Sequence, residues 1–340
     1  MMQVVRPHAE KIRSLHLSFG DNYDICCLLQ HQDDEGSFVE RVWSFPNLEY
    51  LTLKLNALHV DSAVVTAFQS VPKLHTFVLE VNDTILPNQL NIYLPWSQLT
   101  SLTISYIDQS GFRTLITQCL ALENGRFGIG GSAEEFSIVD ITTLRRLTTL
   151  EVGFYGESDS RVFEGIHLPA LDDFSFFVWY FIDFAWTAPQ HMFRQLGSIT
   201  TLSLGGQITA PDMINFLSAT TNVTTFKVQV EDGHGEVFKA LTLSGESENE
   251  ILLPKLCVMY VRTPRCYFGG KPLAVVDLVE MVASRSPSGV GASGVVPLQD
   301  VYLYIPATPN TLKADTDAAL EQWVHKKDMP QVRYKNYERD

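Results

Sequence analysis

The sequence predicts an α/β solenoid in which short parallel strands alternate with helices and loops. A phrase of the form Leu-x-x-Leu-x-Leu, or a close apolar substitute, recurs along most of the 340 residues. In the middle of the chain its copies begin about 25 residues apart. A fixed period of this length indicates stacked units, each of which buries its apolar face only against its neighbours. The predicted fold is therefore an irregular leucine-rich-repeat horseshoe, with a parallel β-sheet on its concave face and helices and loops on its convex face.

Each phrase has a period of two, which is typical of a short strand with one buried face. The whole chain, 1–340, is expected to form one domain of about 10–11 repeats. The copy at 122–127 is degenerate, because it keeps only two of its three apolar anchors. The expected strand phrases begin at Ile12, Leu48, Leu74, Leu99, Leu122, Leu147, Leu171, Ile199, Val223, Leu256 and Leu298.

Several stretches between the phrases have a helical period instead. Apolar residues at helical spacing predict convex helices over 60–68, 112–120, 211–217, 272–284 and 317–326. Asparagine after a strand is typical of these repeats, and only Asn56 and Asn82 occupy that position. Insertions are predicted at about 20–42, 233–252 and 285–297, the last a flexible loop by composition, and a C-terminal helix and tail over 312–340.

Composition favours a folded protein with a protein partner. Hydrophobic residues make up 45% of the chain, which is ample for a continuous core. The formal net charge of −14 argues against binding to nucleic acid or to an anionic membrane, because both select clustered Lys and Arg. The same charge favours basic segments of a protein partner. The five scattered cysteines are typical of reduced thiols, with Cys119 and Cys257 expected in the core.

The N-terminal residues have no apolar signal-peptide core, and the most apolar run, 174–186, is too short to cross a bilayer. We therefore expect a cytoplasmic or nuclear protein, or one found in both places. Most of the aromatic run 174–186 is expected to be buried core packing.

No stretch of the sequence predicts catalysis, a cofactor or a metal. The glycines of 128–131 lack the spacing of a phosphate-binding loop, and 205–207 follows a strand directly, so both are interpreted as turns. Cys257 and Cys266 form no CxxC pair, and the acidic stretch 30–35 lacks the alternation of a calcium loop. The sequence therefore predicts no enzyme, with no catalytic, cofactor-binding or metal-binding residue.

A protein partner is expected on the concave face. Residues between the apolar anchors of each strand point to that face, because side chains alternate along a strand. Aromatic residues and arginine, which are enriched in binding hot spots, gather toward the C-terminal half. The predicted protein-binding residues are Arg126, Glu151, Phe177, Lys227, Gln229, Tyr260, Arg262, Tyr302 and Tyr304.

The phrases also carry a family resemblance. Proline-led beginnings such as Phe-Pro-Asn-Leu at 45–48, Leu-Pro-Trp-Ser-Gln-Leu at 94–99 and Leu-Pro-Ala-Leu at 168–171 resemble the repeat region of fungal F-box proteins. This resemblance covers about 5–303. It implies a substrate-recognition role in a cullin-type ubiquitin ligase, with a Skp1-type adaptor bound by a preceding F-box module.

The F-box module itself is not recognisable here, because the first strand phrase already begins at Ile12. The expectation is a chain that was shortened or that lost the adaptor-binding module, so that an adaptor would bind only if an F-box is encoded upstream. The alternative is a freestanding repeat scaffold or regulator, for example of a GTPase, with no ubiquitin role.

Overall fold

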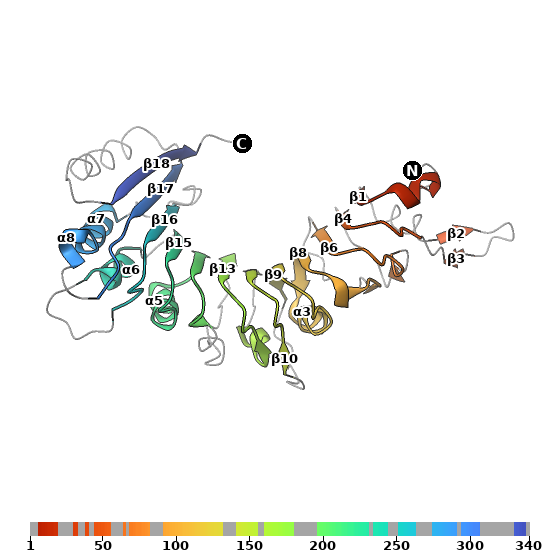
Figure 1. Cartoon of the computed structure of the whole chain (residues 1–340), viewed down its shortest axis with the longest axis horizontal. Coiled ribbons are helices and arrows are strands. Elements are labelled where there is room, and N and C mark those ends of the chain that lie inside the picture. The colour runs from red at the N-terminus through yellow and green to blue at the C-terminus, as the bar shows by residue number, and fades with distance from the viewer. Residues whose placement is uncertain are drawn as a thin grey trace. The chain divides into compact units, whose positions relative to one another are not determined.

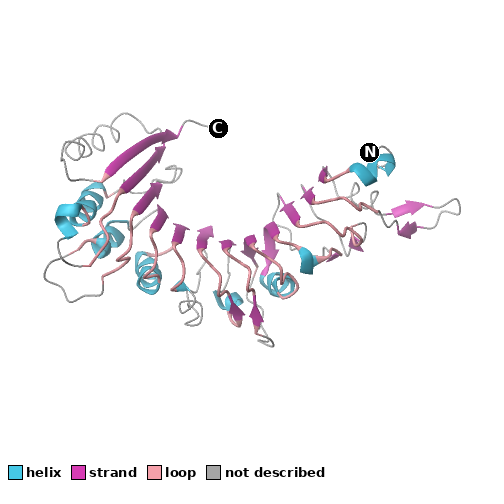
Figure 2. Ribbon diagram, in the orientation of Figure 1, coloured by secondary structure: helices cyan, strands magenta, loops and turns pink. Residues whose placement is uncertain are grey.

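The computed structural model divides the chain into two compact units, which are described separately (Figures 1 and 2). The first comprises Met1–Ala170 with Ile182–Thr187, and the second comprises Leu171–Phe181 with Ala188–Asp340. No helix in the described ranges is long and apolar enough to cross a bilayer. The structure describes residues 6–19, 30–32, 38–40, 44–55, 64–65, 68–81, 91–131, 141–155, 160–179, 196–230, 234–243, 251–262, 274–290, 294–306 and 330–337.

A parallel sheet forms the frame of the first unit. Its strands are neighbours in the order in which they occur along the chain, and each pair is parallel. Parallel neighbours need a crossover connection, which here occupies the rest of each repeat. These strands are β1 (Ser14–Phe19), β4 (Tyr50–Leu55), β6 (Thr76–Val81), β8 (Ser101–Asp108), β9 (Asn124–Gly130) and β11 (Thr149–Tyr155).

The second unit has a parallel sheet of the same kind, again with strands in chain order. The prediction of an α/β fold built on parallel strands is therefore confirmed. Each strand of both sheets begins within two residues of a predicted phrase, apart from the last one. The strands are β13 (Asp173–Trp179), β14 (Thr201–Gly206), β15 (Thr225–Val230), β16 (Val258–Arg262), β17 (Asp300–Pro306) and β18 (Gln331–Tyr337).

A recurring hydrogen-bonded turn leads into these strands. The first apolar residue of a phrase donates its amide to the carbonyl three residues earlier, as Leu74 does to Val71 at 3.1 Å. The carbonyl just before a strand then accepts two successive amides from the next repeat: His75 accepts from Thr100 at 2.9 Å and from Ser101 at 3.0 Å. Because the turn satisfies its own backbone groups, each repeat can join the sheet without buried unpaired amides.

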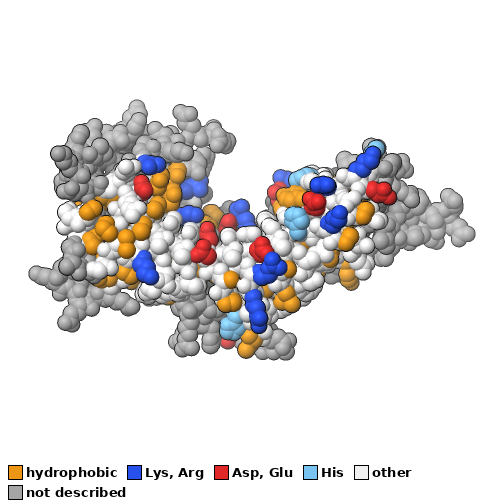
Figure 3. All heavy atoms as spheres, in the orientation of Figure 1, with side chains coloured by type: hydrophobic (Ala, Val, Ile, Leu, Met, Phe, Trp, Pro, Cys, Tyr) orange, Lys and Arg blue, Asp and Glu red, His pale blue; other side chains and the backbone are white. Residues whose placement is uncertain are grey.

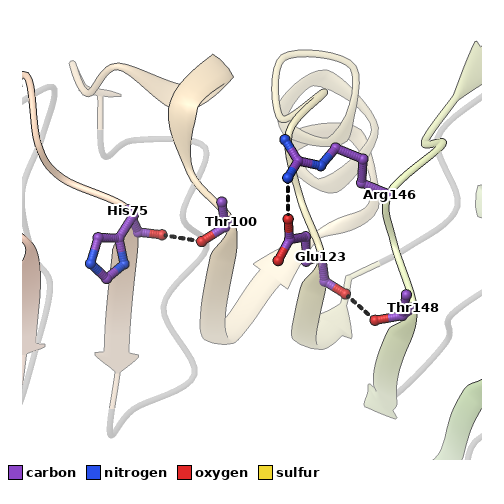
Figure 4. Close-up of polar contacts among 5 residues, drawn as sticks. All are labelled: His75, Thr100, Glu123, Arg146 and Thr148. Atoms are coloured by element: carbon purple, nitrogen blue, oxygen red, sulfur yellow. Dashed lines mark hydrogen bonds and ion pairs between the residues drawn. The ribbon is translucent and has the colours of Figure 1, made fainter.

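Hydroxyl side chains reinforce this turn (Figure 4). The Thr100 hydroxyl donates to the His75 carbonyl at 3.4 Å, and the Thr148 hydroxyl donates to the Glu123 carbonyl at 3.2 Å. Arg146 adds a contact from its guanidinium to the Glu123 carboxylate at 2.5 Å. The threonines that recur in the "LTSL" and "LTTL" phrases therefore bind the preceding repeat as well as favouring the strand.

Side-chain amides form a second set of contacts between repeats. The Asn47 amide donates to the Glu10 carbonyl at 2.7 Å, and the Gln98 amide donates to the Val71 carbonyl at 2.8 Å. In the second unit the Asn222 amide donates to the Gly197 carbonyl at 2.5 Å. These amides lie one residue before a phrase, whereas we expected them after the strand at Asn56 and Asn82, which lie outside the described residues.

Alternating strand residues build the core of each unit. In β4 the pattern is regular, with Leu51, Leu53 and Leu55 buried and the residues between them half-buried. The degenerate copy at 122–127 also forms a strand, β9. Gly125 stands at its second anchor position, and a β-carbon there would meet the ring of Phe127, the third anchor, at 2.8 Å. The phenylalanine ring therefore fills the space that leucine occupies in other copies.

The alternation breaks within β8. A bulge shifts the register between Ile104 and Ile107, and both Ile107 and Asp108 are buried. At the bulge the Ser105 hydroxyl accepts the Val81 amide at 2.7 Å. A bulge adds one residue to one strand, so the side chains that follow it change faces.

Helices pack on the core side of each sheet. α5 (Ala210–Ala219), which Thr209 caps, covers the predicted 211–217. α3 (Gln109–Ile116), which Asp108 caps through the Gly111 amide at 2.6 Å, overlaps the predicted 112–120 but begins three residues earlier and ends four residues earlier. α7 (Val275–Ser284) begins three residues later than the predicted 272, and α6 (His234–Leu241) lies in a predicted insertion. In Figure 1, α5, α6 and α7 line one side of β15–β17, and α6 packs against both of the other helices.

Short elements complete the described secondary structure. Three two-stranded sheets are present: antiparallel β2–β3, parallel β5–β7 and parallel β10–β12. The bounds are η1 (Arg6–Lys11), β2 (Gln30–Gln32), β3 (Phe38–Glu40), β5 (Val64–Val65), β7 (Asn91–Ile92), η3 (Trp96–Gln98), β10 (Thr142–Thr143), η4 (Ser160–Phe163), β12 (Ile166–His167) and α8 (Pro287–Val290).

Three expectations differ from the structure. The prediction of a helix over 60–68 is wrong at Val64–Val65, which form the strand β5. These β-branched residues favour a strand, and they pair with Asn91–Ile92 of β7. The loop predicted over 285–297 begins with a fully buried Arg285 and the helix α8. The tail predicted at the C-terminus contains β18, which pairs with β17, while 312–329 lies outside the described residues.

Candidate protein-binding surface

Each sheet has one face that is free of the hydrophobic core, which we call its open face. Residues on the open face are those that alternate with the buried anchors of the strands. All nine predicted binding residues lie on strands and take these alternating positions. Arg126 and Glu151 belong to the first unit, and the other seven belong to the second. The concave geometry expected for this face stays a prediction.

On the first unit, charged residues of the open face pair with each other across strands. Arg126 of β9 contacts Glu151 of β11 with 3.0 Å between nitrogen and oxygen. Lys54 of β4 contacts Glu80 of β6 at 3.2 Å in the same way. Exposed pairs of this kind contribute at most about 1 kcal/mol to stability. Their charges are locally balanced, which leaves this surface with no strong preference for a charged partner.

The second unit presents a different surface, which carries two stacked tyrosines. Tyr260 of β16 and Tyr302 of β17 occupy the same register position, with ring centroids 4.5 Å apart and planes 9° from parallel. Lys227 is their neighbour on β15, and Arg333 is their neighbour on β18. We call these four residues, Lys227, Tyr260, Tyr302 and Arg333, the tyrosine row.

A second row follows two residues further along the same strands. Gln229, Arg262 and Tyr304 are register neighbours on β15, β16 and β17. The Tyr304 ring stacks diagonally on Tyr260, with centroids 6.3 Å apart and planes 17° from parallel. Figure 3 shows hydrophobic side chains, a class that includes tyrosine, over β16 and β17 with basic side chains beside them. The structure therefore brings six of the nine predicted residues, all but Arg126, Glu151 and Phe177, into one aromatic and basic patch.

Each end of the tyrosine row has a basic residue with an acidic residue nearby. Arg333 lies 3.8 Å from the Asp300 carboxylate and 5.5 Å from the centre of the Tyr302 ring. At the other end, burial raises the pKa of Asp173, and nearby Lys227 lowers it. Burial raises the pKa of Tyr260 as well, with further increases from Tyr302, Tyr304 and Asp300. The Tyr260 hydroxyl is therefore protonated at neutral pH and can donate a hydrogen bond.

The aromatic run at 174–186 divides between core and surface. Phe174, Phe176 and Val178 are buried. Phe177 and Trp179 are half-buried on the open face, where their rings stack with centroids 5.6 Å apart and planes 13° from parallel. Residues 180–186 lie outside the described residues, so the expectation for the rest of the run stays open.

Gly205 explains how Phe177 is held. A β-carbon at Gly205 would lie 2.6 Å from the Phe177 ring, which therefore rests across the glycine of the neighbouring strand. The absence of a side chain at 205 lets the ring lie down against the sheet. Phe177 then contributes a flat, half-buried apolar surface on β13 rather than a projecting side chain.

Sequence reasoning missed Arg333. It was assigned to a mixed-charge tail, whereas the structure places it on β18, directly beside Tyr302. The sequence Gln-Val-Arg-Tyr-Lys-Asn-Tyr at 331–337 holds β-branched and aromatic residues at alternate positions, which is a strand signal. The signal was overlooked because the leucine phrase is absent there.

The stretches considered for other chemistry have structural roles. Residues 128–130 lie inside β9 rather than in a turn, and the Ser105 carbonyl occupies the space beside Gly128. Gly206 has a positive φ of 79° and ends β14, as the interpretation of a turn glycine predicts. Cys119 is buried, and Cys257 is half-buried with its thiol 3.3 Å from the Lys255 carbonyl. Within the described part of the chain, no three His, Cys, Asp or Glu side chains gather as a metal site would require.

Comparisons with known proteins add no relative. No protein-family model matches this sequence, and no curated protein matches it either. The open face of β15–β18 is therefore assigned from its own chemistry. Parallel aromatic rings, basic side chains and tyrosine hydroxyls can bind a flat or extended ligand, and they lack the paired base and nucleophile of a hydrolytic site.

Proposed function

We propose that this chain is a non-enzymatic protein-binding module of the leucine-rich-repeat class, the irregular horseshoe predicted from its sequence. Its support is the repeated unit of turn, strand and crossover, stacked in chain order at the period of the leucine phrases. Such units expose one continuous sheet face, which is the surface that repeat proteins use for binding.

One observation carries this proposal: the patch on β15–β18. Tyr260, Tyr302 and Tyr304 leave part of their surface exposed at neighbouring positions, with Arg262 and Arg333 beside them. Tyrosine and arginine are the residue types most enriched at binding hot spots, and tyrosine offers a large contact area with little loss of side-chain entropy. A cross-strand tyrosine pair stabilises a sheet by only about 0.2–1 kcal/mol, so a binding role accounts better for three tyrosines that stay partly exposed.

Three groups whose pKa values are displaced by burial have packing roles. Burial raises the pKa of Cys119 to about 12, and burial lowers the pKa of Arg285 to about 10. Burial also lowers the pKa of Arg113, whose guanidinium binds the Val162 carbonyl at 2.9 Å. Each of these groups stabilises the packing of helices or turns, and a general acid or base would instead need a pKa near neutrality.

Site-specific photo-crosslinking in cells tests the proposal. A photoreactive amino acid replaces Lys227 or His16, which are exposed on the open faces of the two units, or Ser218 and Gln118, which are exposed on the helical side. We expect a discrete protein adduct from Lys227, with His16 reporting on the first unit, and none from the two control positions. Equal labelling from both sides, or none from either open face, would contradict a binding role for this face.

We further propose that the partner is a substrate of a cullin-type ubiquitin ligase, on the strength of the F-box resemblance. Pull-down with a purified Skp1-type adaptor tests this with two chains: this one, and one extended by the coding sequence upstream of Met1. Adaptor binding by the extended chain alone would place the adaptor module upstream. If neither chain binds the adaptor, the ligase role fails, and a freestanding scaffold or regulator remains as the alternative.

A further inference from the structure

The tyrosine row has a fixed length that a ligand must match. Its four residues occupy one register position on four adjacent strands, β15 to β18. Neighbouring strands lie about 4.8 Å apart, so the strand positions of Lys227 and Arg333 are about 14 Å apart. Two basic side chains are therefore held at this separation, with two tyrosine hydroxyls between them.

The chemistry of the row selects anionic groups at its ends. Lys227 carries a flexible ammonium, and Arg333 carries a planar guanidinium that can bind a carboxylate through two hydrogen bonds. Among the described residues, Asp173 lies near Lys227 and Asp300 lies near Arg333. Lys227 and Arg333 are exposed, whereas Asp173 and Asp300 are half-buried, so the cation is the more accessible member of each pair. The middle of the row is aromatic and suits an apolar contact.

An extended peptide fits this spacing. A strand rises about 3.4 Å per residue, so four residues span about 14 Å. Side chains at i, i+2 and i+4 of such a peptide point to the same side. A peptide that crosses the strands therefore places carboxylates at i and i+4 on the two basic ends, and places residue i+2 on the tyrosines.

We propose that the tyrosine row binds an extended acidic peptide segment of a partner protein, with carboxylates at i and i+4 and an apolar residue at i+2. This proposal rests on the proposed protein-binding function and names the class of segment that is recognised. Long-range electrostatics favour basic partners for a chain of this net charge, whereas the row selects locally for acidic ones. Single-stranded nucleic acid is disfavoured because it carries a phosphate at every nucleotide, and the phosphates beyond the two basic ends are repelled by a chain of net charge −14, whereas the peptide carries only two carboxylates.

Fluorescence anisotropy with the full chain tests the spacing. The probe is a labelled Gly/Ser peptide that contains Glu-Ser-Leu-Ser-Glu, and the control peptides carry Gln for both Glu or have one Ser removed. We expect binding to weaken by roughly tenfold or more for each control, as a lost charge contact predicts. Equal binding of all three peptides, or binding of none, overturns the proposal. Crosslinking at Lys227 would then still decide the broader binding role.

Charge reversal on the protein tests the residues. Arg333→Glu and Lys227→Glu should each weaken binding roughly tenfold or more, whereas Arg145→Glu, an equal charge change at an exposed position of the first unit, should not. A peptide with Lys in place of one Glu, tried at both ends, should restore binding to Arg333→Glu. Far-ultraviolet circular dichroism checks the fold of each variant. Because the two substitutions lie on different strands, the test can still be made with one variant if the other fails to fold.

A single-stranded RNA oligonucleotide serves as the competing ligand. We expect no displacement of the acidic peptide by this RNA at equal concentration. Tight RNA binding that is lost in both Arg333→Glu and Lys227→Glu would overturn the peptide assignment in favour of nucleic acid.

Discussion

Arg285 is the largest side chain that is fully buried in the described residues. Its guanidinium donates to three carbonyls: Leu241 at 2.7 Å, Leu252 at 2.5 Å and Leu253 at 2.9 Å. These carbonyls come from the end of α6 and from the turn before β16, where Leu253 has a positive φ of 46°. One planar fork therefore joins three segments of the second unit that share no strand pairing.

Replacing Arg285 should be costly. Arg285→Met leaves three buried carbonyls without a donor, and we expect a loss of about 3–5 kcal/mol in the free energy of unfolding. Arg285→Lys should lose less, because an ammonium keeps some of the hydrogen bonds. Urea denaturation measures both, with Arg145→Met at an exposed position as the control, expected within about 0.5 kcal/mol of wild type. A loss below about 1 kcal/mol for Arg285→Met would show that water replaces the guanidinium.

Cys119 gives the chain a pH-dependent stability. Burial raises the pKa of its thiol from 9.0 to about 12, so the folded state keeps a proton that the unfolded state loses above pH 9. The stabilisation is fully present below pH 9 and is lost as pH rises toward 12. At pH 10 the loss is about 1.4 kcal/mol relative to neutral pH.

Denaturation of wild type and Cys119→Ala at pH 7 and pH 10 checks this value. The stability difference between the two proteins should shrink by that amount at pH 10. Cys257→Ala, at a half-buried thiol, should show a smaller change. A difference that stays constant between the two pH values would mean that Cys119 ionises in the folded chain.

At the scale of an element, the strand phrases could be predicted because they carry local information. Each phrase holds its own anchors, such as Leu51 and Leu53 in β4, and its own turn residues, so strand position needs no knowledge of the rest of the chain. The helices α3 and α5 were predictable from the spacing of nearby apolar residues, but the predicted start of α3 at 112 was three residues late because its cap, Asp108, was not recognised. The pair Val64–Val65 was predicted as part of a helix, because the apolar residues around it fit a helical spacing and no leucine phrase marks them as a strand.

The end of β14 shows how closely two strands approach. A β-carbon at Gly206 would fall on the Val178 carbonyl, and the φ of Gly206 is +79°. Gly294 has a similar φ of +74°, but nothing lies within 4 Å of the position of its β-carbon. Both glycines have a left-handed backbone, but only Gly206 also has a close neighbour. Comparing the two positions therefore distinguishes the free-energy cost of the close approach from that of the backbone conformation.

Alanine at each of these positions measures the difference. Gly294→Ala should cost about 1–2 kcal/mol, which is the penalty for a side chain at positive φ. Gly206→Ala carries the same penalty and must also separate β13 from β14, so we expect at least about 2 kcal/mol more. Chemical denaturation gives both values, and equal losses would mean that β14 can move away from β13 at no cost.

At the scale of the whole molecule, charge sets how the chain responds to salt. With a formal net charge of −14, the negatively charged side chains repel one another in the folded state, and added salt screens this repulsion. Ion pairs such as Lys54–Glu80 and Arg126–Glu151 are exposed and contribute little that salt could remove. Screening should therefore stabilise the folded chain.

Thermal denaturation at low and high sodium chloride tests this balance. We expect the melting temperature to rise by roughly 2–5 °C between about 20 mM and 500 mM salt. The double variant Glu10→Gln/Glu280→Gln removes two exposed negative charges, so it should melt higher at low salt and respond less to added salt. A melting temperature that falls with salt would show that the exposed ion pairs outweigh the repulsion.

The sequence by itself determined the positions of the strands of both parallel sheets except β18, their buried anchors, and the face on which all nine predicted binding residues lie. These follow from period and alternation, which are properties of adjacent residues. Only the tertiary structure decided that Tyr260 and Tyr302 stack, that Arg333 on β18 completes their row, and that Arg285 is buried. Those outcomes depend on which strands become neighbours and on which carbonyls meet in space, and no local pattern contains that information.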